Sequence, residues 1–401
     1  MARKKSTKSA GMVIVSAADL HLDSTMVGGW DQKEGIHSNW VEAFKQLAAL
    51  VDLCNERKAD LLAISGDVFH NGRPTSEAVY RMNAEFKRLE TAKIVITNGN
   101  HDQSSVVSNH RTPVDAYIGS LPQTFHAAGE SEVVEFNGVD IALIPWHRVA
   151  GTKSLDSTSS VLRDNISRLA EEIADNDRPS FLMGHFTVDE AVMNNGTVLR
   201  SSETMMSGGA LEATVPIDHI DSGPWTFWRA GHVHRRQKLG KKGYYAGSTY
   251  RVSFGEIKEE KGAEVITLFD DSTYEAEFVP FGARKLHILD ISEDLIIPDE
   301  VDDMLQERDI FRVMFPFDAV LPASTNRIIK SLRQRGIEVE PRRLPRAVTT
   351  PEGGKRMSLE TSPKEALQSF YDNRYSGPHD KKSFRKPVLA AFDNVMNGST
   401  H

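Results

Sequence analysis

Short apolar runs alternate with helical stretches along the first part of the chain, and this alternation restricts the fold more than any other feature. Residues 12–15, 61–64 and 94–97 are apolar or β-branched and are bounded by glycine or polar residues, as buried strands are. Between them, residues 40–54 carry apolar side chains at helical spacing, and residues 76–89 carry a more polar version of the same pattern. The order strand, helix, strand, helix, strand predicts an α/β fold with a mostly parallel sheet.

Polar clusters lie at or shortly after the ends of these runs. Two more apolar runs cover residues 180–183 and 226–230. In open α/β sheets, ligands bind outside the carboxyl ends of the strands, so side chains that follow different strands can meet in one place. The five clusters that are expected to meet are Asp19-Leu20-His21, Gly66-Asp67, Gly99-Asn100-His101-Asp102, Gly184-His185 and Gly231-His232-Val233-His234.

The residue types in the clusters indicate a metal site. In extended backbone, residues two apart point to the same side, so Asp19 with His21, and His232 with His234, can each face one metal centre. Carboxylate and imidazole together suit Mn²⁺, Fe²⁺ or Zn²⁺ better than Ca²⁺ or Mg²⁺. Each cluster alone could be an ordinary turn, but their joint occurrence in this order favours a site for two metals.

The five clusters resemble the pattern of the calcineurin-like metallophosphoesterases: D-x-H, G-D, G-N-H-D, G-H and G-H-x-H. The resemblance implies two sheets packed face to face and flanked by helices, with two divalent cations, Mn²⁺ preferred and Fe²⁺ or Zn²⁺ as alternatives. It also implies that His101 protonates the leaving oxygen or stabilises the transition state. The metal ligands that it assigns are Asp19, His21 and His234 for one metal, Asn100, His185 and His232 for the other, and Asp67 for both.

Two further residues are given catalytic supporting roles. The resemblance puts His70 near His101, where it would support that residue or the phosphate; the alternative is a histidine at the start of a helix. Asp102 either orients His101 as a hydrogen-bond acceptor or caps the following helix, and we favour the first. In this chemistry two cations about 3.5 to 4 Å apart share a water, lower its pKa and hold the phosphate oxygens.

Three local features narrow the substrate class, because they carry a second resemblance. Residues 62–70 read Leu-Ala-Ile-Ser-Gly-Asp-Val-Phe-His, residues 245–251 read Tyr-Ala-Gly-Ser-Thr-Tyr-Arg, and an α/β segment follows residue 280. Together they resemble the SbcD and Mre-eleven family of DNA repair nucleases over most of residues 12–347. One departure is Asp23, where the family often has glycine. The compact chain is closer to bacterial, archaeal or phage members than to eukaryotic ones.

The resemblance implies a Mn²⁺-dependent 3′ to 5′ exonuclease and single-strand endonuclease. It also implies an SMC-like ATPase partner of the SbcC or Rad-fifty type, for recombination or double-strand-break repair. Two alternatives stay open. One is a phosphodiesterase or phosphatase for small nucleotides, in which the segment beyond residue 280 would close a small pocket. The other is a structural scaffold that binds DNA ends and recruits the ATPase, which the intact ligand set makes less attractive.

The net charge of −8 requires any DNA to be held by a local basic surface, because neutralising phosphates supplies most of the affinity. A basic cluster directly follows the ligands His232 and His234, although a solvated hairpin is an alternative explanation for it. Its residues Arg235, Arg236 and Lys238 are predicted DNA contacts, and Arg148 and Arg251 are weaker candidates of the same kind.

The domain organisation follows from composition and from the resemblance. We expect a disordered basic tail at 1–11, the nuclease domain at 12–280, a DNA-facing capping domain at 281–347, a linker at 348–362, and ATPase-docking helices at 363–401. In the capping domain the pattern predicts strands at 286–291, 310–316 and 337–340 and a helix at 324–335. Its candidate DNA contacts are Arg327, Lys330, Arg333, Arg335, Arg342, Arg343 and Arg346. A homodimer is expected through residues 76–89 and 112–119.

The single cysteine and the hydropathy pattern predict the compartment. Cys54 lies on the apolar stripe of residues 40–54, so it is expected in the core, and one cysteine allows no disulfide within the chain. No apolar run approaches the roughly 18 residues that a transmembrane helix needs. We therefore expect a cytoplasmic protein without membrane association.

Overall fold

The first of two six-stranded sheets carries three of the five predicted ligand clusters. The computed structural model describes residues 11–103, 112–147, 155–192, 213–290, 309–315, 323–334 and 338–343. Four neighbouring strands of the first sheet pair in parallel, and the two pairings that add the remaining two strands are antiparallel. Its order is β16 (Tyr274–Pro280), β15 (Gly262–Leu268), β1 (Met12–Ala17), β4 (Leu61–Ser65), β5 (Lys93–Thr97) and β6 (Thr124–Ala128).

The second sheet carries the remaining two clusters. Its four central strands are parallel, and an antiparallel strand closes each edge. The order is β13 (Gln237–Leu239), β14 (Gly243–Tyr245), β12 (Phe227–Gly231), β9 (Ser180–His185), β8 (Val139–Ile144) and β7 (Glu132–Phe136). All five strands predicted to precede a ligand cluster are present, and the α/β class with mostly parallel pairing is confirmed.

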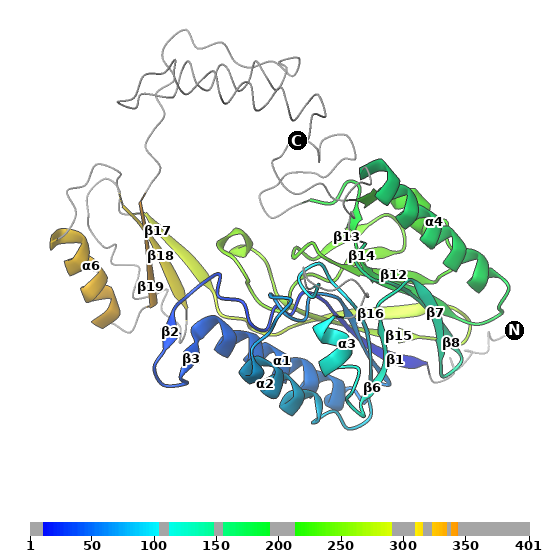
Figure 1. Ribbon diagram of the computed structural model, residues 1–401, viewed down its shortest axis with the longest axis horizontal. Helices are drawn as coiled ribbons and strands as arrows, with labels where there is room; N and C mark the ends of the chain where they lie inside the picture. Colours follow the sequence, from blue (N-terminus) through cyan, green and yellow to red (C-terminus); the bar gives the residue numbers. More distant parts are fainter. Residues whose placement is uncertain are drawn as a thin grey trace, which may run out of the picture. The chain divides into compact units, whose positions relative to one another are not determined.

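The two sheets pack face to face because the strands are apolar on both sides. Ile14 and Ala63 point from the first sheet toward Leu143, Met183 and Phe227 of the second, and all are at most 2% exposed. Alternate residues of the same strands face outward, as the two-residue period of a strand requires. The outward side chains of the first sheet meet α1 (Ser38–Glu56) and α2 (Ser76–Phe86), and those of the second meet α4 (Leu155–Ala174). Figure 1 shows helices on both sides of the paired sheets.

Helix α1 follows the predicted apolar stripe. Leu47, Leu50 and Cys54 are buried against the first sheet, which confirms the core position of the cysteine. Burial raises the pKa of the Cys54 thiol to about 12, so it stays protonated at neutral pH. The helix begins two residues before the predicted start, after His37, whose side chain accepts a hydrogen bond from the N–H of Asn39. An imidazole thus supplies the capping acceptor that serine or aspartate more often provides.

A third sheet, with parallel strands, lies in the segment 281–347, where the sequence pattern predicts strands. Its strands are β17 (Leu286–Asp290), β18 (Ile310–Phe315) and β19 (Glu338–Arg343), and α6 (Ala323–Gln334) joins the last two. Arg284 ties the start of this sheet to α1 by donating to the carbonyl oxygen of Ser38 at 3.2 Å and to Oδ1 of Asn39 at 2.6 Å. The Oγ of Ser38 donates to Glu338 at 2.7 Å.

The remaining elements are short: β2 (Trp30–Asp31), β3 (Ile36–His37), α3 (Pro113–Tyr117), β10 (Thr187–Val188), β11 (Thr214–Val215), α5 (Ile217–Asp221) and a single 3₁₀ turn, η1 (Phe254–Glu256). Within the described ranges, every helix is too short or too polar to cross a bilayer. The predicted basic tail up to residue 10, the linker and the C-terminal helices lie outside the described residues, as do Arg335 and Arg346.

Candidate metal centre

The ends of five strands bring the five clusters to one edge of the paired sheets. In the first sheet Ala17 lies beside Ile64 and Ser65 beside Thr97; in the second, Gly231 lies beside His185. Among the described residues, potential ligand atoms form three overlapping groups, each with all its atoms within 4.8 Å of one another. Two consist of predicted ligands: Asp19, His21 and His234, and Asp19, Asp67 and His185. The third joins His21 to the predicted catalytic residues His70 and His101.

Several predicted ligands have a backbone conformation that residues other than glycine rarely adopt. Asp19, His21, Asp67 and His232 have φ angles of 53°, 39°, 52° and 99°. Such positive φ values cost energy in residues other than glycine and cluster at functional sites. Hydrogen bonds between loops hold the first of them in place, since the N–H of Asp19 donates to the carbonyl of Gly66 at 3.1 Å.

Glycine precedes the ligands because the loops approach one another too closely for a side chain. A Cβ on Gly99 would lie 2.1 Å from Oδ1 of Asp67. A Cβ on Gly66, whose φ is 80°, would lie 2.3 Å from Nδ1 of His185. The Gly-Asp and Gly-Asn pairs of the sequence therefore reflect packing of one ligand loop against the next.

The first ligand set converges on a single point. The Nε2 atoms of His21 and His234 are 3.0 Å apart, and Nε2 of His21 is 3.6 Å from Oδ2 of Asp67. Asp19 holds the second sheet to this point, because its carboxylate accepts the N–H of His232 at 3.0 Å. Two imidazole nitrogens and carboxylate oxygens directed at one place form a donor set that suits a transition-metal cation.

The second set shares Asp67 with the first. Oδ1 of Asn100 lies 2.9 Å from Nε2 of His185 and 3.1 Å from Nδ1 of His232. Nε2 of His185 is also 3.4 Å from Oδ2 of Asp67, the same oxygen that faces His21. The carboxylate therefore stands between the two sets, which is the arrangement expected of a ligand common to two metals. The residues fit a pair of divalent cations, and their identity is open between Mn²⁺, Fe²⁺ and Zn²⁺.

Burial and mutual charge set the protonation of the side chains at this centre. Burial alone would raise the pKa of Asp67, but the neighbouring histidines, His185 foremost, lower it. Burial would likewise lower the pKa of His185, yet the charge of Asp67 and their hydrogen bond raise it to about 9. Burial holds the pKa of His21 well below its usual value. Positive charge is therefore favoured beside Asp67. A bound cation would supply that charge in place of the proton on His185.

His101 and His70 lie together at the edge of the centre. The N–H of His101 donates to Oδ1 of Asp67 at 2.8 Å, and its Nδ1 lies 2.9 Å from the carbonyl oxygen of His70. The two rings stack with centroids 4.6 Å apart. Since Nδ1–H donates to that carbonyl, Nε2 is the ring nitrogen that can serve a substrate. Asp23 accepts the N–H of His70 at 2.5 Å, so this departure from the family pattern supports the same loop.

Asp102 supports the loops rather than the ring of His101. Its carboxylate accepts the N–H groups of Gly99 at 2.9 Å, Phe69 at 3.0 Å and Val68 at 3.4 Å. The acceptor for the His101 ring is the carbonyl of His70, in place of the predicted Asp102. Burial, with the nearby charge of Asp67, raises the pKa of Asp102 to about 7.

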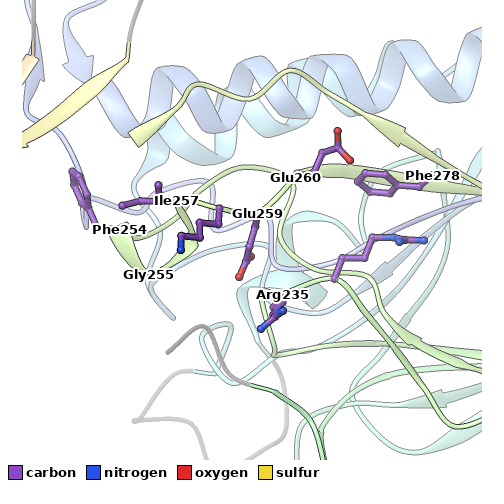
Figure 2. Close-up of a pocket in the computed structure, with 9 residues that line it drawn as sticks. Arg235, Phe254, Gly255, Ile257, Glu259, Glu260 and Phe278 are labelled. Carbon is purple, nitrogen blue, oxygen red and sulfur yellow. The ribbon is translucent and has the colours of Figure 1, made fainter. Parts of the chain in front are cut away.

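The predicted DNA contacts differ in their surroundings, because some are exposed and others are paired with protein groups. Arg235 is exposed and lines a cavity of about 560 Å³ together with Phe254, Ile257, Lys258 and others (Figure 2). Lys238 is exposed on β13. Arg236 pairs with Glu264 at 3.1 Å and lies over the ring of Phe278.

Arg251 is engaged within the protein. Its guanidinium donates to the carbonyl oxygens of Ala283 at 3.0 Å, Arg284 at 2.9 Å and Glu259 at 2.5 Å. These bonds hold the segment that leads into the third sheet, which gives Arg251 a structural role beside the predicted one. Arg148 lies outside the described residues.

Two residues near the ligands were not predicted. Glu256 lies with Oε1 3.0 Å from Nδ1 of His234, and Trp146 covers His232 with ring centroids 4.8 Å apart. Glu256 closes a capping box with Ser253, and the Ser-x-x-Glu spacing of this motif is readable in the sequence. Nothing in the local pattern distinguishes Trp146 from a core residue.

Comparisons with known proteins find similarity to several phosphoesterases. Among solved structures, a dimetal phosphatase from Danio rerio is 10% identical, with 67% of this chain and 99% of that chain covered and a TM-score of 0.44. Purple acid phosphatase PPD1 from yellow lupin (Lupinus luteus) seeds is 11% identical, with 69% and 52% covered and a TM-score of 0.41. The SbcD subunit of the nuclease SbcCD from Staphylococcus epidermidis is 23% identical over 317 residues, which are 74% of this chain and 75% of that protein. The model of the calcineurin-like phosphoesterase family matches residues 12–236, and this chain belongs to that family.

Proposed function

We propose that the chain is the nuclease subunit of a DNA-processing complex. It would cut phosphodiesters with Mn²⁺ as a 3′ to 5′ exonuclease and single-strand endonuclease. The similarity to the SbcD subunit of the nuclease SbcCD carries this proposal. That similarity spans 317 residues, which is longer than the segment 12–236, so it includes sequence outside the part that all phosphoesterases of the family share.

The ligand geometry supports hydrolysis of a phosphate ester. Two divalent cations bound here would activate a water and neutralise charge that builds on the phosphate oxygens. Asp67 would hold the two cations together from its position between the ligand sets. His101 would donate a proton from Nε2 to the leaving oxygen, because its Nδ1 is engaged by the His70 carbonyl. Such a proton transfer typically contributes a factor of about 10² to 10⁴ in rate.

Exposed cations support a polymeric substrate. Arg235 directly follows the proposed ligand His234 and lines a cavity together with Glu259 and Glu260 (Figure 2). Lys258 lines the same cavity. On α6 the side chains of Arg327, Lys330 and Arg333 are all exposed. Because the whole chain carries a net charge of −8, local cations of this kind are what DNA phosphates would need.

Two assembly proposals accompany the nuclease. An SMC-like ATPase of the SbcC type would bind residues 363–401, and a homodimer would form through residues 76–89 and 112–119. Tyr80 on α2 is 70% exposed and Tyr117 on α3 is 38% exposed. Exposed tyrosines are enriched at protein interfaces, which supports this face as the dimer contact. The complex would act in the cytoplasm, where the chromosome is accessible.

The test compares a polymer with a small diester. End-labelled duplex and single-stranded DNA are incubated with Mn²⁺ or Mg²⁺ beside bis(p-nitrophenyl) phosphate, and Asp67→Ala serves as the blank. We expect DNA cleavage that requires Mn²⁺ and disappears in the variant. Turnover of the small diester with intact DNA, even after an ATPase partner is added, would favour the small-nucleotide phosphodiesterase. Binding of DNA ends without any turnover would favour the scaffold.

A further inference from the structure

A buried cluster of charged side chains stands directly behind the metal ligand His234. Glu256, Lys261 and Ser248 are 0%, 3% and 1% exposed. One carboxylate oxygen of Glu256 is 3.0 Å from Nδ1 of His234, and the other is 2.7 Å from Nζ of Lys261. Burying two such charges is costly unless each has partners with good geometry, so the cluster requires an explanation.

The cluster holds His234 at both its ring and its backbone. The ammonium of Lys261 donates to the carbonyl oxygen of His234 at 2.9 Å and to Oγ of Ser248 at 2.9 Å. Glu256 is itself fixed by the turn η1, since Oε1 accepts the N–H of Ser253 at 3.2 Å and Oε2 accepts the N–H of Val252 at 3.3 Å. The ring of His234 therefore cannot rotate without breaking this cluster.

The hydrogen bond also selects the tautomer of His234. Because the Glu256 carboxylate accepts a hydrogen bond from Nδ1–H of His234, the lone pair lies on Nε2, the atom that faces Nε2 of His21 at 3.0 Å. His185 contrasts with it, because its Nδ1 meets the uncharged carbonyl oxygen of Ser65 at 2.8 Å. A carboxylate partner makes a ligating imidazole more basic than a carbonyl partner does.

We propose that Glu256 is a positioning residue for His234, and that Lys261 locks Glu256 in place, so that the metal held by Asp19, His21 and His234 binds more tightly. The inference concerns the metal centre and does not depend on whether the substrate is DNA. The inference rests on these contacts. The sequence pattern does not predict them, because Glu256 lies 22 residues beyond His234 and outside the five ligand clusters.

The test measures Mn²⁺ affinity in the full chain by isothermal titration calorimetry, with the melting temperature of the metal-free protein recorded for each variant. For Glu256→Ala we expect one of the two Mn²⁺ equivalents to bind about 10 to 100 times more weakly, the usual effect of removing such a partner. Glu256→Gln keeps an acceptor for Nδ1–H and should recover part of the affinity. Glu264→Gln is the matched control, since Glu264 is a buried carboxylate whose ion pairs are with Arg229 and Arg236 rather than with a predicted ligand.

A double variant separates positioning from stability. Glu256→Ala removes one of the two carboxylates that pair with the buried ammonium of Lys261, the other being Glu259 at 2.7 Å, and adding Lys261→Met removes the weakened cation. We expect the double variant to regain melting temperature while Mn²⁺ affinity stays low. If affinity returns with stability, or if Glu264→Gln weakens Mn²⁺ binding as much as Glu256→Ala does, then Glu256 stabilises the fold only and the proposal is wrong.

Discussion

The metal centre and the cationic surface beside it are built in opposite ways. Asp19, His21 and Asp67 are at most 1% exposed, and the backbone of each is held by hydrogen bonds between neighbouring loops. Arg235 follows the ligand His234 by one residue but is exposed, and Lys238 is exposed as well. Substitutions in the first region should therefore affect every substrate, whereas those in the second should affect only substrates long enough to reach it.

The largest effect is expected at the carboxylate between the two ligand sets. Asp67→Ala removes the group that faces both His21 and His185, so neither cation would keep the ligand that we propose they share. We expect loss of all detectable turnover on DNA and on bis(p-nitrophenyl) phosphate, and fewer than two bound metals by elemental analysis. A variant that keeps two metals and still hydrolyses either substrate would remove Asp67 from the centre of the site.

A smaller loss, greater on DNA than on the small diester, is expected at His101. In His101→Gln the metals should remain bound while turnover of DNA falls by about 10² to 10⁴, the usual contribution of a general acid. The loss on bis(p-nitrophenyl) phosphate should be smaller, because p-nitrophenolate leaves with little need of a proton. Steady-state rates on DNA and on the small diester measure this, with calorimetry as the check on metal binding. His126→Gln is the control, because His126 lies on β6 and pairs with Glu132. Full activity of His101→Gln on DNA with both metals present would exclude the proton-transfer role.

The contrast between the two regions also explains what could be predicted from the sequence. The ligand clusters were predictable because each follows a strand whose apolar pattern is local, and because parallel strands end at one edge of a sheet. The positive φ of His232 and the clash at Gly99 arise only when loops from different strands meet, and no local rule contains that information. The pattern therefore predicted which residues gather but not how their backbone is held.

The hydrogen-bond partners of individual side chains were the least predictable feature of the site. Asp102 was expected to orient His101, yet three backbone N–H groups occupy its oxygens. The guanidinium of Arg251 similarly meets three carbonyl oxygens. A carboxylate or an arginine has several potential partners within reach, and the tertiary fold decides among them. Charge near a motif is accordingly weaker evidence for a role than a strand end is for a ligand.

A substrate-dependent effect is expected at Arg235. Arg235→Ala should lower kcat/KM on DNA about tenfold, because one hydrogen bond to a charged phosphate contributes roughly 1.5 kcal/mol. Turnover of bis(p-nitrophenyl) phosphate should not change, since this small diester needs only the metals. Arg57→Ala is the control, an arginine paired with Glu277 on β16. Equal losses on both substrates would mean that Arg235 supports His234 rather than DNA.

The smallest effect is expected on α6, where Lys330 is exposed. If this face contacts one DNA phosphate, Lys330→Ala should weaken binding uniformly across sequences and reduce the slope of log affinity against log salt by about 1. Fluorescence anisotropy of a labelled duplex at several salt concentrations measures that slope. The effect must be modest because salt screens an exposed charge over about 8 Å at physiological ionic strength. An unchanged slope would assign α6 to a surface away from DNA, and the cations that hold the polymer would then be those beside His234.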